Sequence, residues 1–240
     1  MNNEELKDAV NNLPKFVMRD MGVKDNGIYT DAPKCKAVTE TSQTNVIATV
    51  SDHYKLVQFS DVFLPMIEKI DNAEGSVVYY NGRANVIAYP SGQDTGVLME
   101  NSVNKTTSVR IRFVKNVNGT TYVIPRAGIL NKMHMGNNII TNVENFSELL
   151  EKVKEEWNTI VDKFTQTAIT QEEADGITKE FCIGKAFIEK CNVPATNLWD
   201  IYKVLVNGLD AIKFRSEIAK MEAIKYIAEM LRKRAFLEKI

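Results

Sequence analysis

Residues 76–89 read SVVYYNGRANVIAY, and this stretch predicts a β-hairpin. Asn81-Gly82 supplies the two positive φ angles of a type I′ turn. The runs on either side are rich in β-branched and aromatic residues, which favour strands. Because a two-residue turn fixes the register, Tyr80 is expected to lie opposite Arg83.

Similar short runs extend over about residues 28–140, separated by Gly, Asn and Asp. A second hairpin is predicted to join residues 108–115 to residues 120–124 through an Asn- and Gly-containing turn. One helix is expected within this region, over about residues 61–70, with Ser60 as its N-cap and Pro65 in or near its first turn. The first part of the chain is therefore expected to be mostly sheet.

The rest of the chain has the spacing of amphipathic helices, with apolar residues at three- and four-residue steps. Thr170 and Glu173 form a capping-box pattern that opens a helix reaching about Cys191. Thr196 or Asn197 is expected to cap a helix over residues 198–212, and residues 214–240 are expected to form a long amphipathic helix. Strands followed by helices predict an α+β fold, with a mainly β region at 1–144 and a helical region at 145–240 that pack together as one unit.

The charge distribution is uneven although the net charge is only −1. The forty-three residues from Asn101 to Val143 contain no Asp or Glu but six Lys and Arg, so all acidic residues lie elsewhere. Uncompensated cations concentrated in one stretch attract polyanions, and nucleic acid is the first partner to consider. The alternative is that these cations pair with acids on the helical part of the same chain.

The strand expected at residues 108–115 would place two of these cations on the same face of a sheet. Side chains alternate along a strand, which puts Val109, Ile111 and Phe113 on one face and Arg110 with Arg112 on the other. The two guanidinium groups then project together, about 7 Å apart from the strand rise. That spacing is close to the spacing of successive phosphates on an extended single strand.

A groove for single-stranded nucleic acid also needs aromatic rings on which bases stack, and tyrosines on the neighbouring predicted strands are candidates. Each tyrosine taken alone is more often a half-buried sheet residue. The predicted nucleic-acid-binding residues are Lys105, Arg110, Arg112, Lys115, Arg126, Lys132, Tyr79, Tyr80, Arg83 and Tyr122.

Motifs for catalysis, metals and cofactors are absent from the sequence. Neither His53 nor His134 lies in a zinc-binding pattern, and there is no P-loop, dinucleotide-binding or nucleophile-elbow motif. We therefore expect no enzyme activity, no metal and no cofactor. The three cysteines form no CxxC pair, which fits a reducing cytoplasm, and no apolar run is long enough to span a bilayer.

Several segments resemble a known family. Residues 50–58 read VSDHYKLVQ and precede the short helix and the Gly-containing hairpin, and residues 197–206 read NLWDIYKVLV. Together with His134 and the Thr170-Gln-Glu-Glu173 turn, they resemble the phage- and plasmid-borne domain-of-unknown-function family nine-three-two over about residues 50–212. The resemblance implies a mobile-element protein encoded among replication and recombination functions, related in architecture to recombinases that anneal single strands. It implies no catalytic residues.

These observations predict a non-enzymatic single-stranded-DNA-binding protein of a phage or mobile element, acting in replication or recombination by strand protection or annealing. RNA is not excluded as the nucleic acid, and a homo-oligomer is possible. One alternative is a protein-interaction module that inhibits a host DNA-associated protein, with the basic strand docking an acidic partner. The other alternative is a nuclease with a cryptic acidic site.

Overall fold

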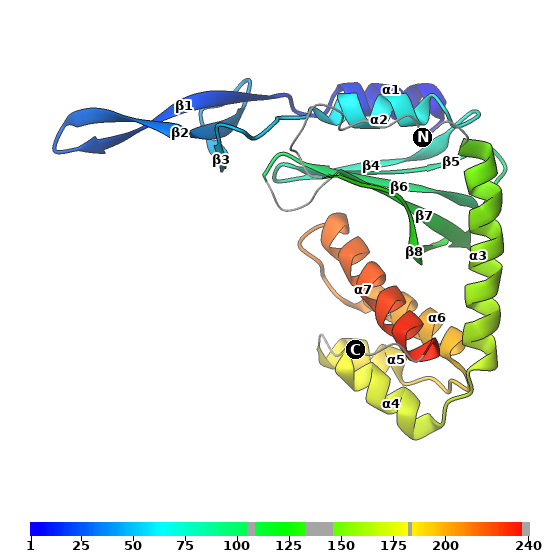
Figure 1. Cartoon of the computed structure of the whole chain (residues 1–240). Helices are drawn as coiled ribbons and strands as arrows, with labels where there is room; N and C mark the ends of the chain where they lie inside the picture. Colours follow the sequence, from blue (N-terminus) through cyan, green and yellow to red (C-terminus); the bar gives the residue numbers. More distant parts are fainter. Residues whose placement is uncertain (105–108, 133–145, 182–183, 237–240) are drawn as a thin grey trace. The chain divides into compact units, whose positions relative to one another are not determined.

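The computed structural model describes residues 1–104, 109–132, 146–181 and 184–236 (Figure 1). The chain has the predicted α+β fold, with antiparallel sheets in its N-terminal half and mainly helices in its C-terminal half. It divides into two compact units. The first comprises Met1–Arg112 and Gly128–Phe146, and the second comprises Phe113–Ala127 and Ser147–Ile240. This division differs from a boundary between residues 144 and 145, because one hairpin segment groups with the helices.

In the described residues, eight strands form two sheets. The three-stranded antiparallel sheet has the order β1-β2-β3, with β1 at Phe16–Asp25, β2 at Ile28–Glu40 and β3 at Val46–Ser51. The five-stranded sheet runs in the order of the sequence, with β4 at Glu74–Tyr80, β5 at Arg83–Tyr89, β6 at Thr95–Ser102, β7 at Val109–Val117 and β8 at Thr120–Lys132.

The hairpins follow the turn chemistry of the sequence. Tyr80 pairs with Arg83 as predicted, and Asn81 and Gly82 have φ angles of 46° and 74°. The β7–β8 hairpin is also present and turns at Asn118-Gly119. A third Asn-Gly pair, Asn26-Gly27, joins β1 to β2 with positive φ at both residues. Strand β1 precedes residue 28, where the first strand was expected, and the Asn26-Gly27 turn is its local signal.

Two helices lie over one face of β4–β6 (Figure 1). Helix α1 spans Asn3–Asn11 and was not predicted, although Asn2 and Glu5 form a capping box in which each side chain accepts a hydrogen bond from the other's backbone N–H. Helix α2 spans Phe59–Ile67, so the expected N-cap at Ser60 and the early place of Pro65 are wrong.

The start of α2 is fixed by a contact with a distant part of the chain. The side-chain oxygen of Gln58 accepts a hydrogen bond from the Phe16 N–H at 3.0 Å, and its amide nitrogen donates to the Phe16 carbonyl at 2.9 Å. The Asp61 carboxylate accepts from the Gln58 N–H. These bonds tie the base of β1 to α2, which explains why local pattern alone placed the helix start too late.

The second unit contains the remaining helices. Helix α3 is Phe146–Gln166, α4 is Gln171–Glu180, α5 is Lys185–Cys191, α6 is Leu198–Gly208, the 3₁₀ turn η1 is Leu209–Ala211, and α7 is Glu217–Ala235 (Figure 1). The Thr170–Glu173 capping box and the Asn197 cap are confirmed. The single helix expected up to Cys191 is instead two helices, α4 and α5. The helix expected over residues 214–240 begins at Glu217, where Ser216 caps it.

Helix α7 is buried on more than the single apolar stripe expected for it. Its buried residues include the adjacent pairs Ile224-Lys225 and Ile227-Ala228, as well as the run Met230-Leu231-Arg232. Two of these side chains are charged, and each has an acid one turn away: Lys225 pairs with Glu222 at 2.8 Å, and Arg232 pairs with Glu229 at 2.9 Å. Such pairing is the usual condition for burying a charge. Across the part of the chain described, no helix combines the length and hydrophobicity needed to cross a membrane.

Candidate nucleic-acid interface

Strand β7 separates its side chains as the sequence predicts. Val109, Ile111 and Phe113 are buried, whereas Arg110 and Arg112 are partly exposed and belong to the opposite face. On the neighbouring strand β6, the Asn101 amide donates to the carbonyl of Val57, just before α2. The face of the sheet that carries Asn101 is therefore the face covered by α2, and the even-numbered residues of β6 lie on the other face.

A buried carboxylate lies beside the arginines. Glu100 on β6 is 0% exposed, and its Oε2 lies 3.5 Å from Nε of Arg112, whose side chain is 26% exposed. The charge of Arg112 is thus matched within the chain, and the two arginines do not form a free pair. The acid-free segment begins at Asn101, so Glu100 lies one residue outside it, and the composition of the segment does not indicate this partner. The alternative of pairing within the chain therefore holds for Arg112, with an acid from the sheet.

Strand register adds further polar groups to this face. Tyr80 pairs with Arg83, and Arg83 pairs with Ser102 across β5 and β6. In the next row Asn85 pairs with Glu100. Opposite residues of antiparallel strands share a face. We call the set Tyr80, Arg83, Asn85, Glu100, Ser102, Arg110 and Arg112 the polar sheet face.

The polar sheet face combines an exposed ring with half-buried charges. The Tyr80 side chain is 42% exposed, the largest exposure among the tyrosines proposed as stacking platforms. Asn85 is only 5% exposed, and its amide oxygen accepts no hydrogen bond from the described residues. Buried polar atoms normally have a partner, so this oxygen is an incompletely satisfied acceptor within the face. The exposed part of the face therefore offers guanidinium donors and an aromatic ring together.

Tyr79, predicted as a nucleic-acid-binding residue, does not belong to this face. Its ring packs against Phe59 of α2 at 5.9 Å between centroids, and its hydroxyl donates to Glu40 at 3.0 Å. The same hydroxyl accepts from the Gly82 N–H. Burial is the main cause that raises the Tyr79 pKa, and the Glu40 carboxylate adds to it. Adjacent residues of a strand point to opposite faces, so Tyr79 and Tyr80 cannot share a site on the sheet surface.

Tyr122 is also unavailable as a stacking platform. It is buried in the second unit, where its ring packs against Trp157, Trp199 and Tyr202 with centroids 5.2–6.4 Å apart. Burial raises the Tyr122 pKa. The Tyr202 hydroxyl donates to the carbonyl of Val123, which ties α6 to β8. The simpler interpretation of this tyrosine as a packed sheet residue is correct.

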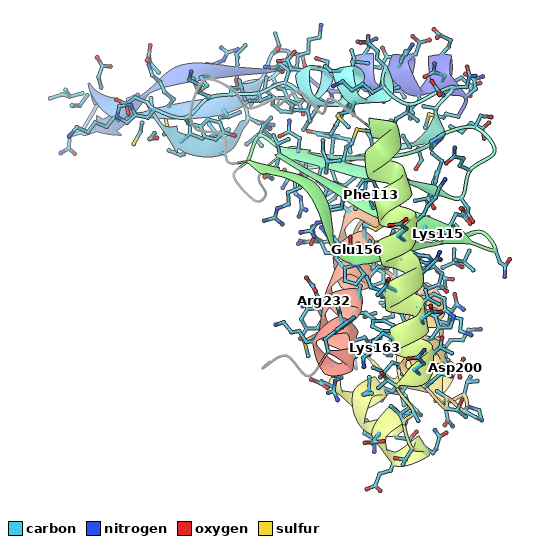
Figure 2. The ribbon with its side chains drawn as sticks, turned by 45° about the vertical axis from the view of Figure 1, so that its right-hand side comes forward. Phe113, Lys115, Glu156, Lys163, Asp200 and Arg232 are labelled. Carbon is cyan, nitrogen blue, oxygen red and sulfur yellow. The ribbon has the colours of Figure 1, made fainter. Side chains whose placement is uncertain are left out.

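No contact in the described residues places the other predicted cations on the polar sheet face. Lys115, labelled in Figure 2, belongs to the second unit. Arg126 and Lys132 lie in β8, but their side chains fall outside the described residues. Lys105 and the segment around His134 also lie outside the described residues.

The described residues contain no group of three or more His, Cys, Asp or Glu side chains placed to hold a metal ion. Comparisons with protein families, with curated proteins and with solved structures give no match for this chain. The resemblance to the domain-of-unknown-function family therefore stays a prediction.

Proposed function

We propose that this protein binds single-stranded nucleic acid through the polar sheet face, with single-stranded DNA as the first candidate. The observation that carries the proposal is the hairpin register, which puts the exposed Tyr80 ring and Arg83 on the face that also holds Arg110 and Arg112. The resemblance noted in the sequence supports a role in replication or recombination of a phage or mobile element, by strand protection or annealing.

The chemistry of the face suits an extended polyanion. Guanidinium groups hold phosphates through paired charge-assisted hydrogen bonds, and an exposed tyrosine offers a stacking surface that accepts any base. Arg112 is held by Glu100 and has a positioning role beside the binding groups. Arg83 and Arg110 supply the phosphate contacts, and Tyr80 supplies the base contact.

A titration of labelled single-stranded and duplex oligonucleotides at several salt concentrations tests the proposal. Single strands are expected to bind more tightly than duplex, with a log–log salt slope of about −0.7 for each phosphate contacted. Changing Arg83 and Arg110 together to Gln should weaken binding by about 1–3 kcal/mol, on the scale of lost hydrogen bonds to charged groups. Tyr80→Ala should cost a similar amount through lost stacking.

Lys7→Gln is the matched control, because Lys7 lies on α1, over the opposite face of the sheet, and is paired with Glu4. This variant should bind like the unmodified chain. Unchanged affinity in the double Arg variant would overturn the proposal, as would tighter binding to duplex. A flat salt response with binding to a host protein would favour the protein-interaction alternative, and magnesium-dependent cleavage would favour the nuclease.

A further inference from the structure

A groove in the second unit, which shares no residue with the polar sheet face, has the features of a ligand site. It lies along helices α5 and α6 and has a volume of about 490 Å³. This volume falls within the range of sites that hold small ligands or a few side chains of a partner. Its lining includes Lys190, Val193, Pro194, Asp200, Lys203, Val204 and Asn207.

The floor of the groove is built by a close approach of the two helices. A Cβ atom at Gly208, another lining residue, would lie 2.3 Å from Sγ of Cys191 and 3.1 Å from the Phe187 ring, so only glycine fits at this point. The Cys191 thiol is buried and contacts the carbonyl of Val204 at 3.6 Å. Burial raises the pKa of this thiol to about 11, so it stays protonated and apolar at neutral pH. The floor is thus firmly packed.

The rim combines apolar and cationic groups. Val193 is 47% exposed, and Pro194 beside it is also exposed, so the two side chains offer apolar surface at the rim. Lys190 is exposed, and the contacts described for this part of the chain give it no acidic partner. Its ammonium group therefore remains available to an incoming anion.

The second lysine is held in place. Nζ of Lys203 lies 3.1 Å from Oδ1 of Asp200 and 5.9 Å from the Trp199 ring centroid. Oδ2 of Asp200 accepts a hydrogen bond from the Thr196 hydroxyl at 3.0 Å. Burial raises the Asp200 pKa, but the bonds from Lys203 and Thr196 outweigh it and lower the pKa overall. Asp200, labelled in Figure 2, is therefore a satisfied carboxylate that orients Lys203.

We infer that this groove binds a short acidic peptide segment that carries a large apolar side chain. The apolar side chain packs against Val193, Pro194 and Val204, and a carboxylate of the peptide meets Lys190. Lys190 and Lys203 outnumber the single Asp200 of the lining, so the groove is net cationic as well as apolar and is complementary to such a segment. The Asn207 amide can donate to a peptide carbonyl. A nucleic-acid base would have no ring on which to stack, because no aromatic residue among those described lines the groove. The nearby Trp199 ring packs against Tyr122, Trp157 and Tyr202.

Fluorescence anisotropy with the full chain tests this inference. The probe is a fluorescein-labelled hexapeptide, Asp-Asp-Leu-Phe-Asp-Asp, compared with one version in which Asn replaces every Asp and another in which Ala replaces Leu and Phe. Saturable binding of the first peptide is expected, with at least tenfold weaker binding of both others. Absence of saturable binding, or equal binding of the Asn version, would overturn the inference.

Variants locate the site. Lys190→Glu should weaken binding of the acidic peptide at least tenfold, Lys190→Gln should weaken it less, and Val193→Asp should abolish it. Lys185→Glu is the matched control, because Lys185 lies on the same helix, is 91% exposed and does not line the groove. Thermal melts establish whether each variant folds. If Lys190→Glu does not fold, Lys190→Gln is the milder variant that still tests the site.

Peptide binding by the groove can be tested separately from nucleic-acid binding by the polar sheet face. Oligonucleotide affinity should not change in Lys190→Glu if the groove serves a peptide. Loss of oligonucleotide binding in this variant, with peptide binding retained, would overturn the inference and assign the groove to nucleic acid.

Discussion

The two faces of strands β4–β6 differ in character: one is apolar and packed under helices, and the other is polar. One face packs under α1 and α2 with buried side chains such as Val86 and Met99, and the other face carries Arg83, Asn85 and Glu100. Consecutive residues therefore differ in role: Tyr79 packs on α2, and Tyr80 is exposed on the polar side. A shift of one residue in register therefore decides whether a side chain packs in the core or lies on the polar sheet face.

The two faces also differ in what stabilises them. The face under α2 is held by burial of apolar surface, which is not directional and depends on volume. The polar sheet face depends on specific partners, because a buried charge or amide without one is costly. Substitutions on the face under α2 should therefore lower the free energy of unfolding according to the volume removed. Substitutions on the polar sheet face should lower it according to the partner removed.

The largest expected effect is on the apolar face. Phe59 of α2 is buried and packs against Phe16, Phe63 and Tyr79. Phe59→Ala should lower the free energy of unfolding by about 3–5 kcal/mol, the scale for removing a buried aromatic ring. Phe59→Leu, which keeps most of the volume, should cost markedly less. Urea denaturation measures both, and equal effects of the two variants would mean that packing does not dominate this face.

An intermediate effect is expected on the polar face. Glu100→Gln should lower the free energy of unfolding by about 1–3 kcal/mol, because it leaves the Arg112 guanidinium without its counter-charge. Arg112→Met in the same chain should recover part of this loss, since the uncompensated charge is then gone. A double-mutant cycle by urea denaturation measures the coupling. Strictly additive effects would show that the pair contributes nothing to stability.

The smallest expected effect compares the adjacent tyrosines. Tyr79→Phe removes the hydroxyl bonded to Glu40 and should cost about 0.5–1.5 kcal/mol. Tyr80→Phe should change stability by less than about 0.5 kcal/mol, as at other exposed sites. A larger cost for Tyr80→Phe than for Tyr79→Phe would reverse the assignment of the two faces.

The Tyr79 variant also has a pH signature. The Tyr79 pKa in the folded chain is raised, mainly by burial, so the folded state resists loss of this proton. Its contribution is fully present below the unfolded value of about 10 and is lost as the pH rises through the higher folded value. The stability difference between the unmodified chain and Tyr79→Phe should therefore shrink above about pH 10. A difference that is constant with pH would contradict this linkage.

Local features of the fold could be predicted because their causes are local. The Asn81-Gly82 turn requires two positive φ angles, and the Thr170–Glu173 capping box satisfies backbone N–H groups within one turn. Alternation along β7 likewise needs only the geometry of one strand. The same rules, applied to Asn26-Gly27 and to Asn2–Glu5, would have found β1 and α1.

The features that were missed depend on residues distant in sequence. Gln58 sets the start of α2 through Phe16, forty-two residues away. Tyr122 is buried because α3 and α6 bring Trp157, Trp199 and Tyr202 to it. Helix α7 is buried on several sides, which its own periodicity does not indicate.

The candidate site divides in the same way. Local sequence suffices to predict which cations the segment carries, that Arg110 and Arg112 share one side of β7, and that Tyr80 lies opposite Arg83. Contacts between distant segments are needed to see that Glu100 neutralises Arg112, that Asn85 joins the same face, and that Tyr79 and Tyr122 pack against other aromatic rings. The physical reason is that turn and strand geometry act between neighbours in the chain, whereas burial and charge pairing depend on which strands and helices meet in space.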